Sequence, residues 1–298
     1  MMSRDNNDMI REMEWCRDIV ERRLHELFTE AGSSYATLVE SMRYSLLAGG
    51  KRVRAVICMK FCEAVGGKIE DAIDAACAIE MLHTYTLIHD DLPGMDGDDM
   101  RRGKPSNHIQ YGEFTAILAG DALQATSFET LANTSLPPAS IVEMIQVLAY
   151  VAGPHGLCGG QFLDLSGEGW HLTIDELLEL YSMKTAALIS AAARLGVIAG
   201  GGTKEQIEAA DAYSQAIGLA FQVRDDVLDC IATAEELGKP IGSDVENEKS
   251  TFASLLGVEA CEKMINKETE KAITALEGKF ENVEFLTWIA KILAERKK

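Results

Sequence analysis

The sequence predicts an all-α protein, and three observations support this prediction. Aromatic residues make up only 6% of the chain, while the strong helix formers alanine and leucine are abundant. Apolar residues recur mostly at steps of three and four, the period of a helix with one buried face. No stretch alternates apolar and polar residues for longer than chance would give, as a strand would.

Glycine and proline divide the chain into the expected helices. In chain order these cover residues 8–30, 35–47, 54–65, 70–91, 114–132, 139–151, 173–199 and 206–232. Pro93 ends the fourth, because proline cannot continue the hydrogen-bond ladder and disfavours helix at the residue before it. Thr173 and Glu176 are spaced as a capping box. Residues 96–108 and 236–249 are expected to be polar connections, and the C-terminal part returns to helices.

All 298 residues are expected to form a single domain, residues 1–298. No Pro-rich, Ser-rich or low-complexity linker divides them, and no short repeat is present. Hydrophobic residues make up 47% of this length, which is enough for a large core.

The charge, the cysteines and the absence of long apolar segments bear on partners and on location. A net charge of −19 repels nucleic acid phosphates, so no nucleic acid partner is expected. The seven cysteines form no C-x-x-C pair and are expected to be reduced thiols of the core. The polar start of the chain lacks an apolar signal region, and no uncharged apolar run of about 18 residues appears. We therefore expect no membrane span and a cytoplasmic location.

Two aspartate clusters interrupt the ends of long apolar segments. The first comprises Asp90, Asp91 and Asp96, and the second comprises Asp225, Asp226 and Asp229. Carboxylates packed together in apolar surroundings repel one another and lose hydration, and a divalent cation relieves both problems. A solvated helix end would explain one such cluster, whereas two at equivalent positions favour Mg²⁺ binding shared with substrate phosphates.

Basic residues accompany the acidic clusters. Gly49-Gly50 precedes Lys51, Arg52 and Arg54 at a helix start, a combination that favours anions. Arg101 and Arg102 follow the first cluster, with which they could also simply pair. The remaining candidates are Lys184, Thr185, Gln222, Lys239 and His83. Each lysine could be an ordinary surface residue and His83 an ordinary core residue, but together the set suits diphosphate chemistry.

At this point the motifs resemble a known family. In order they are Gly-Gly-Lys-Arg-x-Arg (49–54), His83, His-Asp-Asp-Leu-Pro-x-Met-Asp (89–96), Arg-Arg-Gly-Lys-Pro (101–105), Gly-Asp-Ala-Leu (120–123), Gly-Gly-Gln-x-x-Asp-Leu (159–165), Lys-Thr (184–185), Phe-Gln-x-x-Asp-Asp-x-Leu-Asp (221–229) and Gly-Lys-Pro-x-Gly-Ser-Asp (238–244). This order resembles the trans-isoprenyl diphosphate synthases, especially the bacterial farnesyl and geranylgeranyl diphosphate synthases. The resemblance covers about residues 40 to 257.

The resemblance implies a fold, a cofactor and residue roles. The fold would be a helical bundle of the isoprenoid synthase type around a deep central cavity, assembled as a homodimer. Three Mg²⁺ ions per active site would be held by Asp90, Asp91 and Asp96 on one wall and by Asp225, Asp226 and Asp229 on the other. An allylic diphosphate would be held by Arg101, Lys184 and Lys239. Isopentenyl diphosphate would be held by Lys51, Arg54, His83 and Arg102, and Thr185 and Gln222 would line the site.

The implied reaction joins isopentenyl diphosphate to dimethylallyl or geranyl diphosphate and releases diphosphate. In this family the residues one turn before the first cluster set product length, and here these are Tyr85 and Thr86. A bulky Tyr85 would block a growing chain early, so we expect a C15 product, farnesyl diphosphate. The alternatives are a C20 or C10 product, with Tyr85 merely packed in the core.

Two other classes of protein share parts of this pattern. A terpene cyclase would use similar metal chemistry, but it would not need Lys51 and Arg54, and its second metal motif usually differs. A catalytically silent partner subunit typically loses one aspartate motif, whereas both are intact here.

Overall fold

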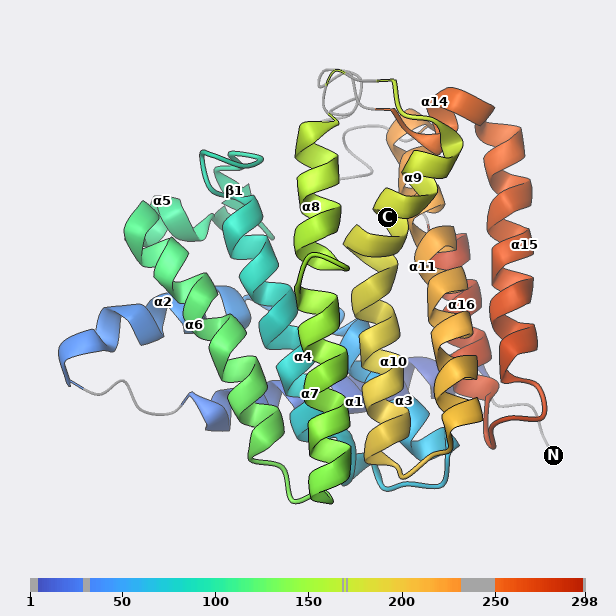
Figure 1. Ribbon diagram of the computed structural model, residues 1–298, viewed down its shortest axis with the longest axis horizontal. Coiled ribbons are helices and arrows are strands. Elements are labelled where there is room, and N and C mark those ends of the chain that lie inside the picture. Colours follow the sequence, from blue (N-terminus) through green and yellow to red (C-terminus); the bar gives the residue numbers. More distant parts are fainter. Residues whose placement is uncertain (1–4, 29–32, 168, 170, 232–249, 297–298) are drawn as a thin grey trace. The chain divides into compact units, whose positions relative to one another are not determined.

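Helices form almost all regular structure in the computed structural model, which describes residues 5–28, 33–167, 169, 171–231 and 250–296 (Figure 1). The prediction of an all-α fold is therefore confirmed. The exception is a short antiparallel hairpin inside the predicted polar connection, β1 (Met100–Arg101) and β2 (Lys104–Pro105). It is too short to show as sequence alternation, since each strand has two residues.

The described residues belong to two compact units. The first comprises Met1–Leu148 and Leu195–Gly202, and the second comprises Ala149–Arg194 and Thr203–Lys298. The expectation of one domain over residues 1–298 and of a central cavity concerns how these units are joined, and it stays a prediction.

The first unit is built around a long buried helix. Its elements are α1 (Asn6–Leu27), η1 (Ser33–Tyr35), α2 (Ala36–Leu46), α3 (Val53–Ala64), α4 (Ile69–Asp90), the hairpin, α5 (Asn107–Tyr111), α6 (Glu113–Ala132), most of α7 (Pro138–Ala152) and the end of α10 (Ala187–Ala199). Helix α4 packs on α3 and α6, and it carries small buried residues such as Ala72, Ala75 and Ala76. A Cβ at Gly196 would lie 2.0 Å from the Cys58 carbonyl oxygen, so α10 ends in backbone contact with α3.

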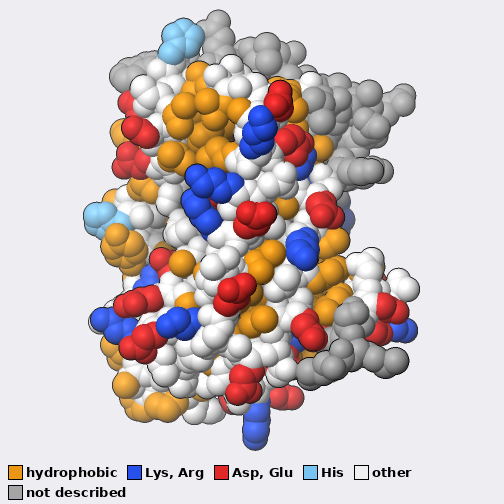
Figure 2. Space-filling model, turned by 90° about the vertical axis from the view of Figure 1, so that its right-hand side faces the viewer, with side chains coloured by type: hydrophobic (Ala, Val, Ile, Leu, Met, Phe, Trp, Pro, Cys, Tyr) orange, Lys and Arg blue, Asp and Glu red, His pale blue; other side chains and the backbone are white. Residues whose placement is uncertain are grey.

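The second unit contains the other long helices. Its elements are α8 (Leu157–Ser166), α9 (Ile174–Tyr181), the π-helical turn η2 (Ser182–Ala186), the start of α10, α11 (Lys204–Ile231), α14 (Phe252–Leu256), α15 (Val258–Leu276) and α16 (Glu284–Glu295). Leu180, Val223, Val227, Phe252 and Ile265 form much of its core. The face that carries α15 shows acidic and basic side chains interspersed with apolar areas (Figure 2).

Glycine and proline predicted most boundaries to within a few residues, and the capping box at Thr173 and Glu176 is present. The expected helix over 173–199 is wrong in one respect, because η2 interrupts it. Helices α5 and α8 were not predicted, and residues 236–249 lie outside the described residues.

Two described stretches are long and apolar enough to cross a membrane by length and composition alone, 138–166 and 174–199. In the second, 78% of the apolar window is buried inside the structure, as in the core helix of a globular protein; in the first, the share is 39%. The expectation of no membrane span stays a prediction.

Candidate functional site

The first aspartate cluster lies in a tight turn at the end of α4. Pro93 stops the helix as predicted, and Asp91 occupies its C-cap. The Asp96 amide donates to the Asp90 carbonyl oxygen at 2.9 Å, which folds the segment back on the helix end. The turn thus brings the backbones of Asp90 and Asp96 together, although they are six positions apart in sequence.

Asp91 already has a strong cationic partner within this unit. Its carboxylate is buried and accepts hydrogen bonds from Arg101 Nε, at 2.8 Å, and from Arg101 Nη2. This pair ties the hairpin to the end of α4. The predicted role of Arg101 at an allylic diphosphate and that of Asp91 at a metal stay predictions. In this structure the two residues form an ion pair with each other.

The hairpin that carries Arg101 and Arg102 is anchored to α2 by a residue that sequence analysis missed. Asn107 is buried and donates from Nδ2 to the Ser41 carbonyl oxygen, at 2.9 Å, and to Ser45 Oγ, at 2.8 Å. Tyr44 donates to the Pro105 carbonyl oxygen at 2.8 Å. The available signal was a polar residue, Asn107, two positions after the Arg-Arg-Gly-Lys-Pro motif.

The predicted isopentenyl group comes from α3, α4 and the hairpin. Arg54 Nη1 lies 3.4 Å from His83 Nε2, and Arg102 donates to the Gly49 carbonyl oxygen. Lys51 is exposed and lies three positions before Arg54 in the sequence. Gly49 and Gly50 have φ values of 82° and 135°, which only glycine adopts readily, and a Cβ on Gly50 would meet the Arg102 guanidinium.

In the part of the chain that the structure describes, neither arginine of this basic group is paired with a carboxylate. Among the residues that the structure describes, Arg54 and Arg102 form no ion pair, and Arg54 Nε is buried without a hydrogen-bond partner. Burial lowers the pKa of Arg54, and lost hydration together with Arg52 lowers the pKa of Arg102. Burial and the neighbouring arginines also hold the pKa of His83 well below its usual range, so its imidazole is neutral at pH 7. Cations held this way favour an incoming anion.

The second unit gathers Lys184, Thr185 and Gln222 around the second cluster. Lys184 Nζ donates to Asp164 Oδ2 at 2.6 Å, and Thr185 Oγ1 donates to Gln222 Oε1 at 2.9 Å. Lys184, Gln222, Asp164 and Asp226 line a pocket within this unit. Asp164 belongs to the Gly-Gly-Gln-x-x-Asp-Leu motif, but its ion pair with Lys184 was not predicted.

Two glycines set the position of Lys184. The π-helical turn η2 carries it, a local geometry often found at functional sites. A Cβ on Gly160 would lie 2.5 Å from the Lys184 amide nitrogen, and one on Gly218 would lie 2.5 Å from Ala186 Cβ. Only glycine at these positions lets α8 and α11 approach η2 so closely.

The three carboxylates of the second cluster have different surroundings. Asp226 is buried and accepts from Tyr181 OH, at 3.0 Å, and from the Phe252 amide, at 2.8 Å. Asp225 pairs with Arg296, whose guanidinium also lies 3.9 Å from the Phe221 ring centroid. Burial lowers the pKa of Arg296 to about 10. Asp229 Oδ1 is buried without a hydrogen-bond partner in the described residues.

These residues fit Mg²⁺ as a bound cofactor. Within the described segments no three His, Cys, Asp or Glu side chains are placed close enough to hold an ion alone. Mg²⁺ accepts such partial sites, because it keeps several waters and shares positions with substrate phosphates. The buried, unpartnered Asp229 oxygen is the feature that a cation would satisfy directly. The predicted number of three ions stays a prediction.

The remaining predicted residues are the two expected to set product length, Tyr85 and Thr86, and Lys239. Tyr85 is buried in α4 and packs edge-on against His89, with ring centroids 5.5 Å apart. Thr86 Oγ1 donates to the His83 carbonyl oxygen at 2.8 Å. Lys239 lies outside the described residues.

Comparisons with known proteins agree with the motifs. The sequence model of the polyprenyl synthetase family matches residues 35–292. The geranylgeranyl diphosphate synthase of Cyanophora paradoxa is 46% identical over 86% of this chain and 86% of its own length. The large subunit 1 of the heterodimeric chloroplastic geranylgeranyl pyrophosphate synthase of Arabidopsis thaliana is 47% identical over 80% of this chain, and the match spans 66% of that protein.

Solved structures match over nearly the whole chain. An FPP/GFPP synthase from Zymomonas mobilis is 34% identical, with a TM-score of 0.86, over 96% of this chain and 99% of its own. The geranylgeranyl pyrophosphate synthetase of Pyrococcus horikoshii is 33% identical, with a TM-score of 0.86, over 96% of this chain and 98% of its own. The extent of these matches and the match to the family model place the chain in one group: it belongs to the polyprenyl synthetase family.

Proposed function

We propose that this protein is a Mg²⁺-dependent prenyltransferase that joins isopentenyl diphosphate to an allylic diphosphate, most of its product being geranylgeranyl diphosphate (C20). The observation that carries the proposal is the basic group of the first unit. A half-buried arginine, Arg54, forms no ion pair among the described residues and lies beside a neutral His83. Such a group binds a dianionic phosphate without first breaking an ion pair.

The two substrates would use different residues. Lys51, Arg54, His83 and Arg102 would hold the isopentenyl diphosphate, because they form one basic group of the first unit. Lys184, with Thr185 and Gln222, would hold the allylic diphosphate, and Lys184 would exchange Asp164 for the phosphate. Arg101 and Lys239 complete the predicted allylic set.

The aspartates would hold the cofactor. Asp90, Asp91 and Asp96 would supply one set of ligands, and Asp225, Asp226 and Asp229 the other. Bound Mg²⁺ would neutralise the allylic diphosphate and so make it a better leaving group. Within the protein, Arg296 would have to leave Asp225, and Arg101 would have to share Asp91, when the site is loaded.

The reaction then needs positioning more than proton transfer by side chains. The allylic carbon–oxygen bond breaks, and the electron pair leaves with diphosphate. The double bond of isopentenyl diphosphate attacks the resulting cation, and a proton passes to the departing diphosphate. The residues of the chain contribute electrostatic stabilisation and orientation, which usually provide the largest part of such a rate enhancement.

Product length is the finer part of the proposal. Relatives at 46–48% identity are named geranylgeranyl synthases, and these names favour C20 over the C15 product that Tyr85 predicts. The buried, ring-packed position of Tyr85 supports C15 as the second candidate. Its close packing against His89 would leave a growing chain little room at that point.

The test is an incubation of the purified protein with isopentenyl diphosphate and, separately, dimethylallyl, geranyl and farnesyl diphosphate, with Mg²⁺ or with a chelator. Products are dephosphorylated and measured by mass. Metal-dependent geranylgeraniol from all three starters is expected. Farnesol alone, with no product from farnesyl diphosphate, would establish the C15 candidate. A cyclic hydrocarbon would point to a cyclase, and no product to a silent subunit.

We further propose that the protein forms a homodimer through α6. Phe114, Ile117 and Leu118 are 75%, 43% and 49% exposed and lie on one stripe of this helix. Light scattering after size exclusion is expected to give twice the mass of 32.5 kDa. Phe114→Asp is expected to reduce it to the monomer mass, whereas Ile10→Asp, at an exposed site on α1, should leave it unchanged. A monomeric wild-type protein would contradict this proposal.

The cytoplasmic location also stays a proposal. It is supported by the seven cysteines, none of which is paired in a disulfide. Several relatives carry chloroplastic in their names, so localisation of a fluorescent fusion in the source cell is the direct test.

A further inference from the structure

Arg52 is the one arginine of the basic motif that cannot meet a substrate. Its side chain is 1% exposed, whereas Lys51 beside it is exposed. Its backbone has φ 50° and ψ 33°, in the left-handed region that costs a side-chain-bearing residue free energy. Such a conformation persists only when its surroundings determine it.

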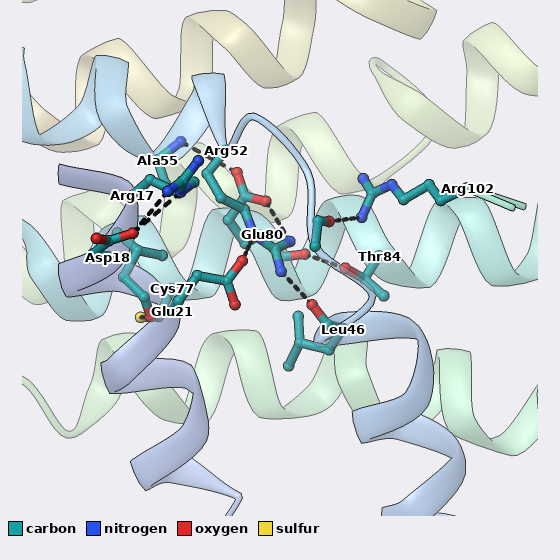
Figure 3. Close-up of polar contacts among 12 residues, drawn as sticks. Arg17, Asp18, Glu21, Leu46, Arg52, Ala55, Cys77, Glu80, Thr84 and Arg102 are labelled. Atoms are coloured by element: carbon teal, nitrogen blue, oxygen red, sulfur yellow. Dashed lines mark hydrogen bonds and ion pairs between the residues drawn. The ribbon is translucent and has the colours of Figure 1, made fainter. Parts of the chain in front are cut away.

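Three acceptors surround the Arg52 guanidinium (Figure 3). Its Nε donates to Glu21 Oε1 on α1 at 2.7 Å, its Nη1 to Glu80 Oε2 on α4 at 3.1 Å, and its Nη2 to the Leu46 carbonyl oxygen at the end of α2. Burial alone would lower the pKa of Arg52, but Glu80 and Glu21 outweigh it and raise the pKa. The guanidinium therefore joins three helices at one point.

Glu80 also holds the start of the next helix. Its second oxygen, Oε1, accepts from the Ala55 amide in the first turn of α3, at 3.3 Å. This is the interaction that an N-cap residue normally makes from within its own helix. Glu80 thus fixes Arg52, two positions before Arg54, and Ala55, directly after it. The other end of the same turn is held by Arg102 on the Gly49 carbonyl oxygen.

We infer that Glu80 and Arg52 are positioning residues that hold the 49–54 turn so that Lys51 and Arg54 meet isopentenyl diphosphate. The inference rests on the proposed function. Neither residue would touch the substrate. Glu80 is 3% exposed, and its negative charge alone would weaken the binding of an anion nearby. Its position is therefore explained by the geometry that it imposes on the turn.

The sign of this effect separates positioning from simple electrostatics. Glu80→Gln keeps the size and an acceptor for Ala55 but removes the charge that holds Arg52. If positioning dominates, the KM for isopentenyl diphosphate should rise about tenfold or more, because small displacements of binding groups are costly. The KM for the allylic diphosphate and the Mg²⁺ requirement should stay within about twofold of wild type. If charge dominates, the same variant should bind isopentenyl diphosphate more tightly.

Arg52→Lys provides a second, milder variant. Lysine keeps the positive charge but cannot donate to three separated acceptors at once, so the same selective rise in KM is expected. Asp74→Asn is the matched control. It breaks the Arg23–Asp74 ion pair between α1 and α4, of 2.8 Å, at a site outside the turn. This control should lower thermal stability without changing either KM.

Binding can be measured without turnover, because isopentenyl diphosphate has no partner to react with when it is alone. Calorimetric titration of each variant with this substrate should show the same loss of affinity as the KM. An unchanged or lowered KM in Glu80→Gln, or an equal rise for both substrates, would overturn the inference. Wild-type protein that neither binds isopentenyl diphosphate nor forms product would instead overturn the proposed function.

Discussion

The two aspartate clusters look alike in sequence but are built differently. The first lies in a turn after a helix end, and Arg101 from the neighbouring hairpin pairs with its Asp91. The second lies within a continuous helix, α11, and is held by a tyrosine hydroxyl, a backbone amide and an arginine near the C-terminus. In the first unit the prominent groups are thus arginines without an ion pair among the described residues, Arg54 and Arg102. In the second unit they are carboxylates, among them Asp226, which is buried, and Asp229, whose Oδ1 has no hydrogen-bond partner in the described residues. Similar motifs can therefore have different structural surroundings.

The largest effect is expected from removing a carboxylate of either cluster. Asp90→Asn and Asp229→Asn should each lower kcat by about 10²–10³, the loss typical of one electrostatic contact to the reacting group. Product formation at saturating substrates, over a range of Mg²⁺ concentrations, measures this. Asp175→Asn, at an exposed position in the first turn of α9, is the control and should keep full activity. Full activity in either variant would contradict the proposed role of that cluster in holding Mg²⁺.

The next effect is a structural one and is confined to the second cluster. Tyr181→Phe removes a hydrogen bond to the buried Asp226 carboxylate and should lower the free energy of unfolding by about 1.5–3 kcal/mol. Urea denaturation measures this loss. Tyr44→Phe removes a more exposed hydrogen bond, to the Pro105 carbonyl oxygen, and should cost less. Equal losses in the two variants would show that the carboxylate at position 226 does not depend on Tyr181.

A pH dependence is expected from the first unit. The folded protein lowers the pKa of His83 below the unfolded value of about 6.5, so the unfolded state binds more protons as the pH falls through this range. This contribution to stability is therefore complete above about pH 6.5 and is lost as the pH falls toward the folded pKa. His83→Gln should remove it, and the stability of the variant relative to wild type should improve on acidification. A pH-independent difference between the two unfolding curves would contradict the assignment.

The smallest effect concerns Arg296. Its pairing with Asp225 competes with a cation at that carboxylate, so Arg296→Ala should reduce the Mg²⁺ concentration needed for half-maximal activity. The pair is partly exposed, so the expected change is about 0.2–1 kcal/mol, or less than about sixfold. Glu295→Ala, at the exposed neighbouring position, is the control. An increased Mg²⁺ requirement would instead assign Arg296 to holding substrate.

Short sequence patterns predicted helix ends and caps, which depend on residues close together in the chain. Pro93 and the glycine pairs ended helices where expected, because proline and glycine act on the backbone within a few residues. Helix α8 was not predicted. Glycine lowers helix propensity, but Gly160 is needed here for close packing on η2. The capping box at Thr173 was found from its spacing alone.

The candidate site was predicted as a set of residues but not as a set of interactions. Asp226 depends on Tyr181 and on Phe252, which are 45 and 26 positions away. No spacing rule reaches that far, because these contacts arise from tertiary packing. The same holds for Arg52 and Arg54, which the motif presents alike. Only the tertiary structure shows that Arg52 is buried and joins helices, whereas Arg54 has an Nε without a hydrogen-bond partner in the described residues.

The π-helical turn η2 changes the direction in which the side chains after it point. A π turn holds one residue more than an α turn, and each residue of an α-helix advances the direction of the side chains by about 100°. The side chains of α10 are therefore rotated by about this angle from where an unbroken continuation of α9 would point them. The segment thus stays helical from α9 through α10, while the direction of its side chains changes at η2.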